Sequence, residues 1–390
     1  MRALSHTAKQ RRVSRLLLWA ILVLGHSAHA ALFTPKLDSD IVETLRDRPL
    51  DRTDLEYRAL RRQLRASPAV LPIALAVARS SMAIARRDGD PRYFGYAQAA
   101  LNPWWASANM PEPVRLLKAT LLQSVHQFDP ALYELGQVLK ANPRNAQAWL
   151  TQASIFQVQG RYADAAESCE HLEPLGAGLY ENACLAELAS LTGDATGARS
   201  RVAALVAVAT GSARSWLLLM QAELEERIGD FAAADRDFRL ILADSPDAYS
   251  KAAYADFLLD RGRAAEVIPL LAKDQRADPL LLRLALAYRA TGDPGLAASV
   301  LTLTARFDAA HLRGDQVHQR EEARFQLYLL GRSDAALRLA LANWAVQREP
   351  ADARILLESA QVDRHPEAAN PVRAFVRQNR LVDQRLAPYL

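Results

Sequence analysis

Six glycines recur along the chain at a nearly constant interval, and this repeat constrains the fold more than any other feature. The intervals between them are 33, 36, 33, 30 and 39 residues. A repeat of about 34 residues accommodates one helix, a tight turn and a second helix, and such units are stable when stacked on their neighbours. The spacing therefore predicts an array of helical hairpins. The glycines are Gly160, Gly193, Gly229, Gly262, Gly292 and Gly331.

Alanines accompany the glycines at two fixed offsets. An Ala where two helices cross lets their axes approach, and a Gly in the turn can adopt the left-handed conformation that ends a helix. Arg324 and Val267 stand where a small residue is usual, and His126 replaces the turn glycine of an earlier unit. Seven residues before five of the glycines stand Ala153, Ala186, Ala222, Ala255 and Ala285. Five residues after five of them stand Ala165, Ala198, Ala234, Ala297 and Ala336.

The composition agrees with an all-α protein. Hydrophobic residues make up 50% of the 390 residues and charged residues 24%, and these proportions are typical of a globular protein rather than a disordered one. Ala, Leu, Arg and Glu, which favour helices, are abundant. No stretch of alternating Val, Ile or Thr predicts a strand.

The first 30 residues are predicted to be an export signal. Basic residues precede an apolar run of ten residues from Leu16 to Gly25, and Ala28-His29-Ala30 supplies small residues for cleavage before Ala31. The run is shorter than the about 20 residues of a membrane-spanning helix. We therefore expect a periplasmic protein; an uncleaved N-terminal anchor and secretion are the alternatives. No later segment has the length of a membrane span.

The net charge does not indicate a nucleic-acid partner. The full chain carries 48 Lys and Arg against 44 Asp and Glu. Five of the basic residues and none of the acidic ones lie in segment 1–30, so cleavage leaves 43 against 44, a net charge of −1. Nucleic-acid binding needs a clustered basic face.

The chain divides into five segments by pattern. Residues 1–30 are the signal, 31–70 form a charged, helical approach, and 71–111 form an irregular first hairpin. Residues 112–350 hold about seven regular units, with later units starting near 179, 215, 248, 278 and 317, and residues 351–390 close the array. Within the last segment, Asp352 to Ala360 and Pro371 to Leu386 are predicted to be helices. The aromatic pair Trp104-Trp105 is expected to fill the joint between the first hairpin and the array; an exposed anchor for a partner is the alternative.

Two units carry a specific pattern. One is Trp149, Ala153, Phe156, Gly160, Tyr162 and Ala165; the other is Leu218, Ala222, Gly229, Phe231, Ala234, Phe238 and Pro246. This pattern resembles the tetratricopeptide repeat (TPR), over about residues 75–360. The resemblance implies a right-handed superhelical α-solenoid. The whole chain is similar to the exported tetratricopeptide proteins of Gram-negative bacteria.

In that family the first helix of each unit lines a concave groove, which implies a partner-binding surface here. Acids and aromatics predominate on the corresponding positions, with Arg227 as the one opposing charge. Such a surface suits a protein or peptide segment that carries Lys or Arg; a merely solvated face with pairs such as Glu223–Arg227 is the alternative. Reversing Glu223 and Glu226 to Lys is expected to weaken binding with little change in melting. The implied groove residues are Gln123, Gln157, Tyr180, Glu187, Trp216, Glu223, Glu226, Tyr249, Asp256 and Asp260.

The two cysteines, Cys169 and Cys184, fall on helices of neighbouring units. After export they could form a disulfide, or they could remain two small core residues. They do not form a C-x-x-C redox motif.

No catalytic, phosphate-binding or zinc-binding signature occurs in the sequence, and no metal, cofactor or small-molecule substrate is predicted. The leading interpretation is a non-catalytic scaffold of the bacterial envelope that binds a protein or peptide. One alternative is a subunit of an envelope secretion or polysaccharide-export assembly. Another is an enzyme with an acidic site around Glu187 or Asp256.

Overall fold

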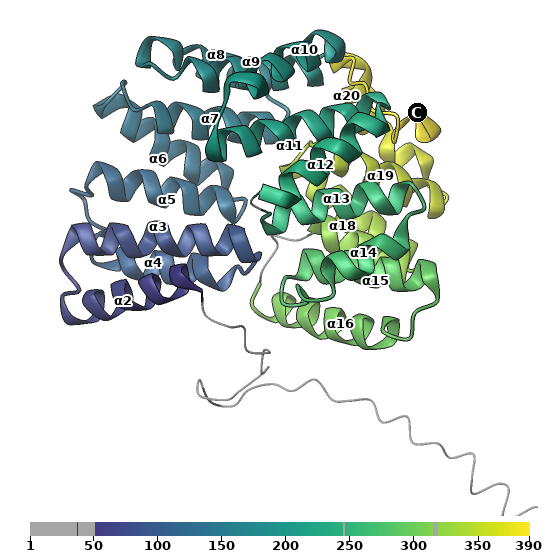
Figure 1. Ribbon diagram of the computed structural model, residues 1–390, viewed down its shortest axis with the longest axis horizontal. Coiled ribbons are helices and arrows are strands. Elements are labelled where there is room, and N and C mark those ends of the chain that lie inside the picture. Colours follow the sequence, from purple (N-terminus) through teal and green to yellow (C-terminus); the bar gives the residue numbers. More distant parts are fainter. Residues whose placement is uncertain (1–36, 38–50, 245, 315–318) are drawn as a thin grey trace, which may run out of the picture. The chain divides into compact units, whose positions relative to one another are not determined.

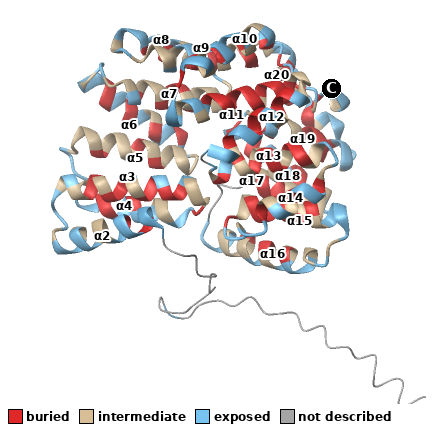
Figure 2. Cartoon of the chain, viewed as in Figure 1, coloured by how far each residue is buried: buried red, intermediate tan, exposed pale blue. Residues whose placement is uncertain are grey.

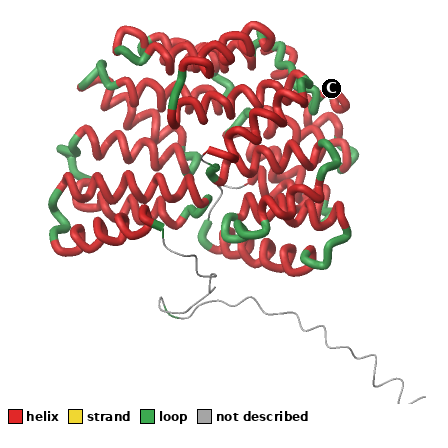
Figure 3. Tube along the Cα trace, viewed as in Figure 1, coloured by secondary structure: helices red, strands yellow, loops and turns green. Residues whose placement is uncertain are grey.

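The computed structural model describes residues 37, 51–244, 246–314 and 319–390. Over these ranges the chain contains helices and no strand, which confirms the predicted all-α class (Figure 3). The chain divides into two units, residues 1–47 and 48–390, and every helix described below belongs to the second. The predicted signal, residues 1–30, lies outside the described residues. No helix in the described ranges is both long and apolar enough to cross a membrane.

The helices follow one another as hairpins, each with a first and a second helix (Figure 1). Helix α2 (Arg52–Ala66) precedes them. The first helices are α3 (Leu71–Asp88), α5 (Glu112–Ser124), α7 (Ala146–Val158), α9 (Gly178–Leu191), α11 (Gly211–Ile228), α13 (Ala248–Asp260), α15 (Asp278–Thr291), α17 (Gln319–Arg324) continued by the π-helix η2 (Phe325–Leu329), and α19 (Pro350–Val362). The second helices are α4 (Arg92–Trp105), α6 (Phe128–Ala141), α8 (Tyr162–Glu170), α10 (Ala195–Val208), α12 (Phe231–Asp244), α14 (Ala264–Leu271), α16 (Leu296–Leu312), α18 (Ser333–Val346) and α20 (Asn370–Asn379). Short 3₁₀ segments are η1 (Glu173–Leu175), η3 (Pro366–Ala369) and η4 (Ala387–Tyr389).

Each helix packs against the next one in the chain, and the first helices also contact one another in succession. Contacts run from α3 to α5, α7, α9, α11, α13 and α15, then through η2, and from α17 to α19. Buried residues are dense on α11 and α19 (Figure 2). The first helices therefore form a continuous row, and side chains on that row can share one surface.

The turn glycines behave as predicted. The six repeat glycines all have positive φ, between 68° and 101°. His126, which replaces the glycine in the hairpin of α5 and α6, has a φ of 57° and so takes the same left-handed conformation with a side chain present. This conformation ends the first helix and lets the second one begin within a few residues.

The alanine offsets hold except in the hairpins of α15 and η2. Nearly all of the offset alanines are buried, but Ala297 is exposed and Ser299 is buried in its hairpin instead. The cause is the turn: α16 begins four residues after Gly292, whereas α8 begins two residues after Gly160. The two extra residues shift the register of α16 by two positions.

Arg324 is the second departure, and the π-helix explains it. Each hydrogen bond of a π-helix spans five residues, one more than in an α-helix. The five residues of η2 start just after Arg324, so Ala323 rather than Arg324 occupies the fully buried position. The Arg324 side chain is thereby left to pair with Asp256 on α13, with 2.7 Å between Nη2 and Oδ1.

The C-terminal segment differs from the prediction. The expected helix from Pro371 to Leu386 ends at Asn379, because Arg380 adopts the left-handed conformation with a φ of 53°. The residues beyond it do not continue outward as a polar cap. They return to the turns of earlier hairpins, where the backbone N–H of Gln384 donates to the carbonyl of Arg227 (3.0 Å).

The C-terminal segment packs closely against the glycine turns of earlier hairpins. A Cβ on Gly160 would collide with the ring of Phe375, and one on Gly193 would press on Arg380. These turns therefore need glycine for two reasons, the positive φ and the approach of a distant part of the chain. Trp104 and Trp105 pack partly buried against the cluster that joins α3 and α4 to α5, in agreement with a joint.

Candidate functional site

A cavity of about 1300 Å³ lies along the row of first helices. Of the ten implied groove residues, eight are among the described residues that line it: Gln157, Glu187, Trp216, Glu223, Glu226, Tyr249, Asp256 and Asp260. Gln123 and Tyr180 are not among the lining residues. Helix α5, which carries Gln123, contributes none of them, and Tyr180 instead packs its ring 5.9 Å from that of Trp216.

The wall is not predominantly acidic, and here the sequence interpretation was incomplete. Arg227 is joined by other arginines whose side chains balance the carboxylates. The described lining includes the further arginines Arg86, Arg283, Arg289, Arg320, Arg324, Arg354 and Arg385.

For some of these lining residues, the position in the sequence predicts that they line the cavity. In the family that the repeats resemble, the groove register comprises the second, fifth, ninth, twelfth and thirteenth positions of each first helix. Counted from Pro350 at the start of α19, the fifth and ninth positions are Arg354 and Glu358, and both line the cavity. The same register on α15 predicts Arg289. Arg385 carries no such signal, because it lies beyond the helices and reaches the wall only through the return of the C-terminal segment.

Asp256 and Asp260 are fully engaged by arginines of this chain. The guanidiniums of Arg283 and Arg324 lie 2.6 and 2.7 Å from the two oxygens of Asp256. Burial by itself would raise the pKa of Asp256, but these two cations outweigh it and hold the pKa well below its ordinary value. Asp260 accepts from Arg354 Nη2 at 2.9 Å.

Glu226 is a structural residue rather than a free groove carboxylate. It is only 3% exposed, and Arg385 Nη1 donates to its Oε2 at 3.0 Å. The other oxygen, Oε1, is buried without a partner within the described structure. Burial raises the pKa of Glu226 to about 7 in spite of Arg385. Contrary to the expectation from the sequence, reversing Glu223 and Glu226 to Lys should therefore lower the melting temperature, since a second cation would face Arg385 at the buried position of Glu226.

Glu223 and Tyr249 form a different kind of pair. The Tyr249 hydroxyl donates to Glu223 Oε1 at 2.9 Å. Tyr249 keeps 54% of its surface accessible, yet protein surrounds it, as expected for a side chain that points into a wide cavity. Burial raises the pKa of Glu223 to about 7, and the nearby charge of Glu187 adds to the effect. Glu223 is thus a carboxylate in the cavity with a neutral partner.

Glu187 completes this part of the wall. Its nearest cation is Arg227, 3.6 Å away, and Arg227 also donates to the Ser190 hydroxyl at 2.6 Å. Burial raises the pKa of Glu187, and Arg227 only partly opposes it. Two carboxyl groups, Glu187 and Glu223, therefore line this part of the cavity with one arginine, Arg227, close to them.

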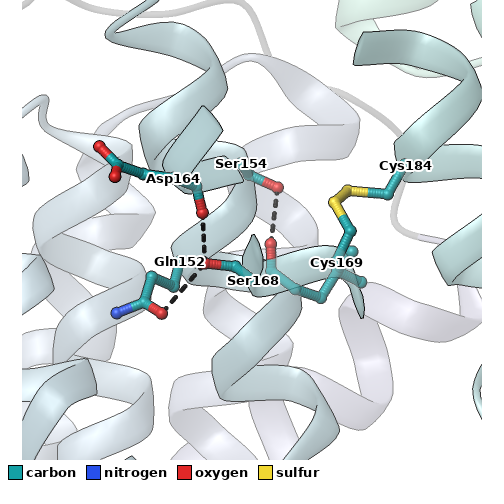
Figure 4. The surroundings of a disulfide bond; sticks show 7 residues. Gln152, Ser154, Asp164, Ser168, Cys169 and Cys184 are labelled. Carbon is teal, nitrogen blue, oxygen red and sulfur yellow. Dashed lines mark hydrogen bonds between the residues drawn. A yellow bond between two sulfur atoms is a disulfide. The ribbon is translucent and has the colours of Figure 1, made fainter. Parts of the chain in front are cut away.

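The two cysteines form a disulfide bond between α8 and α9 (Figure 4). Cys169 on α8 and Cys184 on α9 are joined in the structure, with their Cα atoms 6.1 Å apart, and Cys184 also lines the cavity. Next to Cys169, the Ser168 hydroxyl donates to the backbone carbonyl of Asp164 at 2.9 Å. The bond ties together two neighbouring hairpins at the cavity wall.

The described residues contain no group of three or more His, Cys, Asp or Glu placed to hold a metal ion. No family model matches the chain, and no curated protein matches it significantly.

Proposed function

We propose that this chain is a tetratricopeptide-like scaffold of the bacterial envelope that holds a peptide or an extended protein segment in the cavity, without catalysis of its own. One observation carries the proposal. Eight groove residues that the resemblance implies, drawn from α7, α9, α11 and α13, meet at a single cavity. The succession of contacts between first helices supports a right-handed solenoid as the underlying architecture.

The size and lining of the cavity favour a peptide over a small molecule. Its volume of about 1300 Å³ exceeds the roughly 300–1,000 Å³ of most small-molecule sites. Its wall alternates carboxylates and arginines and also presents the aromatic rings of Trp216 and Tyr249. A peptide can match such a wall along its length, because successive side chains can differ in charge.

The ionisation of Asp256 favours a binding role over acid–base catalysis for this carboxylate. Asp256 was a candidate for an acidic catalytic site, but two arginines hold its pKa below the ordinary value. A general acid needs a pKa near the working pH, so Asp256 is poorly suited to donate a proton near neutrality. Its role in the proposal is to fix the arginines of the wall.

The test is photo-crosslinking in intact cells. A photoreactive amino acid replaces Tyr249, which points into the cavity, or Tyr133, which is 65% exposed on α6 and does not line the cavity. We expect position 249 to yield a defined crosslinked peptide by mass spectrometry, in the envelope fraction, and Trp216→Ala to reduce its yield. Equal products from positions 249 and 133, or no polypeptide product from position 249, would contradict the proposal.

A further inference from the structure

The geometry points to a specific subsite within this cavity: we propose that Glu223 and Tyr249, flanked by Glu187 and Trp216, bind one cationic side chain, Arg or Lys, of the bound peptide. This inference rests on the proposed function. It goes beyond it by naming the chemical group that the cavity selects and the residues that select it.

The first argument is the distribution of partners among the predicted carboxylates. Within the described residues, Asp256, Asp260 and Glu226 each pair closely with an arginine of this chain, at 3.0 Å or less. Among the residues that the structure describes, Glu223 has the Tyr249 hydroxyl as its hydrogen-bond partner and makes no ion pair. Its carboxylate therefore keeps acceptor capacity toward the cavity. A cation on the ligand would give Glu223 the ion pair that arginines of the chain give to Asp256, Asp260 and Glu226.

The second argument is that the chain already shows such binding one helical turn away. Glu226 follows Glu223 by three residues on α11, and it binds Arg385, which comes from a non-helical segment. That segment also uses its Gln384 backbone N–H and side chain to reach the carbonyls of Arg227 and Ile228. The same helix therefore accepts an arginine from an irregular stretch of polypeptide, with the segment seated on the carbonyls at the helix end.

The third argument is the uncompensated charge around the subsite. Glu187 and Glu223 have Arg227 as a shared neighbouring cation, which lies 3.6 Å from Glu187 and makes no ion pair with Glu223 among the described residues. Burying carboxylates without matched cations is costly, so a bound cation gains from all of these charges. The rings of Tyr249 and Trp216 line the same wall and can stack on a guanidinium or an ammonium group.

The experiment measures selection among peptide pools by the full chain. Five pools of acetylated, amidated heptapeptides have random flanks and one fixed central residue: Arg, Lys, citrulline, norleucine or Glu. Citrulline has nearly the shape of Arg without its charge. We expect the protein to retain Arg and Lys pools at least about 10-fold more than the citrulline pool, which is the range of a charge-assisted hydrogen bond.

Two variants and one control locate the effect. Glu223→Gln should bring the Arg-to-citrulline ratio close to one, and Tyr249→Phe, which keeps the ring but loses the hydroxyl, should lower it by a smaller factor. The matched control is Glu170→Gln, an exposed glutamate on α8 that does not line the cavity, and it should keep the wild-type ratio. Circular dichroism melting checks that each variant is folded.

The outcomes separate the two proposals. If the wild type retains every pool equally, or if Glu223→Gln keeps the wild-type ratio, the cation subsite is wrong and peptide binding stands. If the wild type retains no pool, peptide binding in this cavity is wrong, and the subsite falls with it.

Discussion

Replacing Glu226 by Gln should stabilise the protein at alkaline pH and leave its stability unchanged at acidic pH. Glu226 is 3% exposed, and burial raises its pKa from the ordinary 4.5 to about 7. The folded state therefore binds the Glu226 proton more tightly than the unfolded state does. The stability linked to protonated Glu226 is fully present below pH 4.5 and is lost as the pH rises through 7.

The magnitude follows from the size of the shift. A rise from 4.5 to about 7 corresponds to roughly 3 kcal/mol between pH 4 and pH 8. Gln keeps the shape of the protonated acid and cannot ionise. Arg385 retains Asp383 as a partner at 2.7 Å, so its own charge stays compensated. We therefore expect the variant to gain up to about 3 kcal/mol over the wild type at pH 8, or several degrees in Tm.

The assay is thermal melting of both proteins from pH 4.5 to pH 8.5. Glu223 and Glu358 also have pKa values raised to about 7, so the wild type will remain pH-dependent for other reasons, and the informative quantity is the difference between the two proteins. Glu170→Gln serves as the exposed control. A difference that is the same at both ends of the range would refute the reasoning, because it would show that the Glu226 proton is not linked to folding.

Two further predictions concern the turns and the cysteines. Gly160→Ala should cost more stability than Gly262→Ala, although both glycines have positive φ, because only at Gly160 would a Cβ collide with another residue, the ring of Phe375. The backbone cost shared by both is about 1–2 kcal/mol. Equal Tm losses would mean that Phe375 does not pack against this turn. The disulfide between Cys169 and Cys184 closes a loop with a sequence separation of 15, so replacing both cysteines by Ser should destabilise the protein by about 3 kcal/mol under oxidising conditions. The wild type treated with reductant should have the same stability as this variant. Free thiols in purified, non-reduced wild type would show that the bond does not form.

Much of the local structure was predictable because it depends on short-range rules. The turn glycines take the left-handed conformation that ends a helix, and His126 does so in their place, as the repeat indicated. The row of groove residues on α7 to α13 followed from one periodic register. The failures are also instructive: Ala297 is displaced by a turn two residues longer, and Arg324 by an extra residue within the π-helix η2. Both are local insertions, and a prediction that places residues at a fixed spacing from the turn glycine does not account for them.

The sequence by itself therefore determined the helical class and the glycine turns, because helix propensity and turn chemistry act over a few residues. The resemblance to the tetratricopeptide repeat pointed to eight of the residues that line the cavity. Tertiary structure alone decided which carboxylates remain available. Arg385 reaches Glu226 across 159 residues of chain, and Arg324 reaches Asp256 across 68. Pairings of this kind depend on where distant segments pack, and no local pattern encodes them. The difference between Glu223, which has a neutral partner, and Glu226, which pairs with an arginine, arises in the same way.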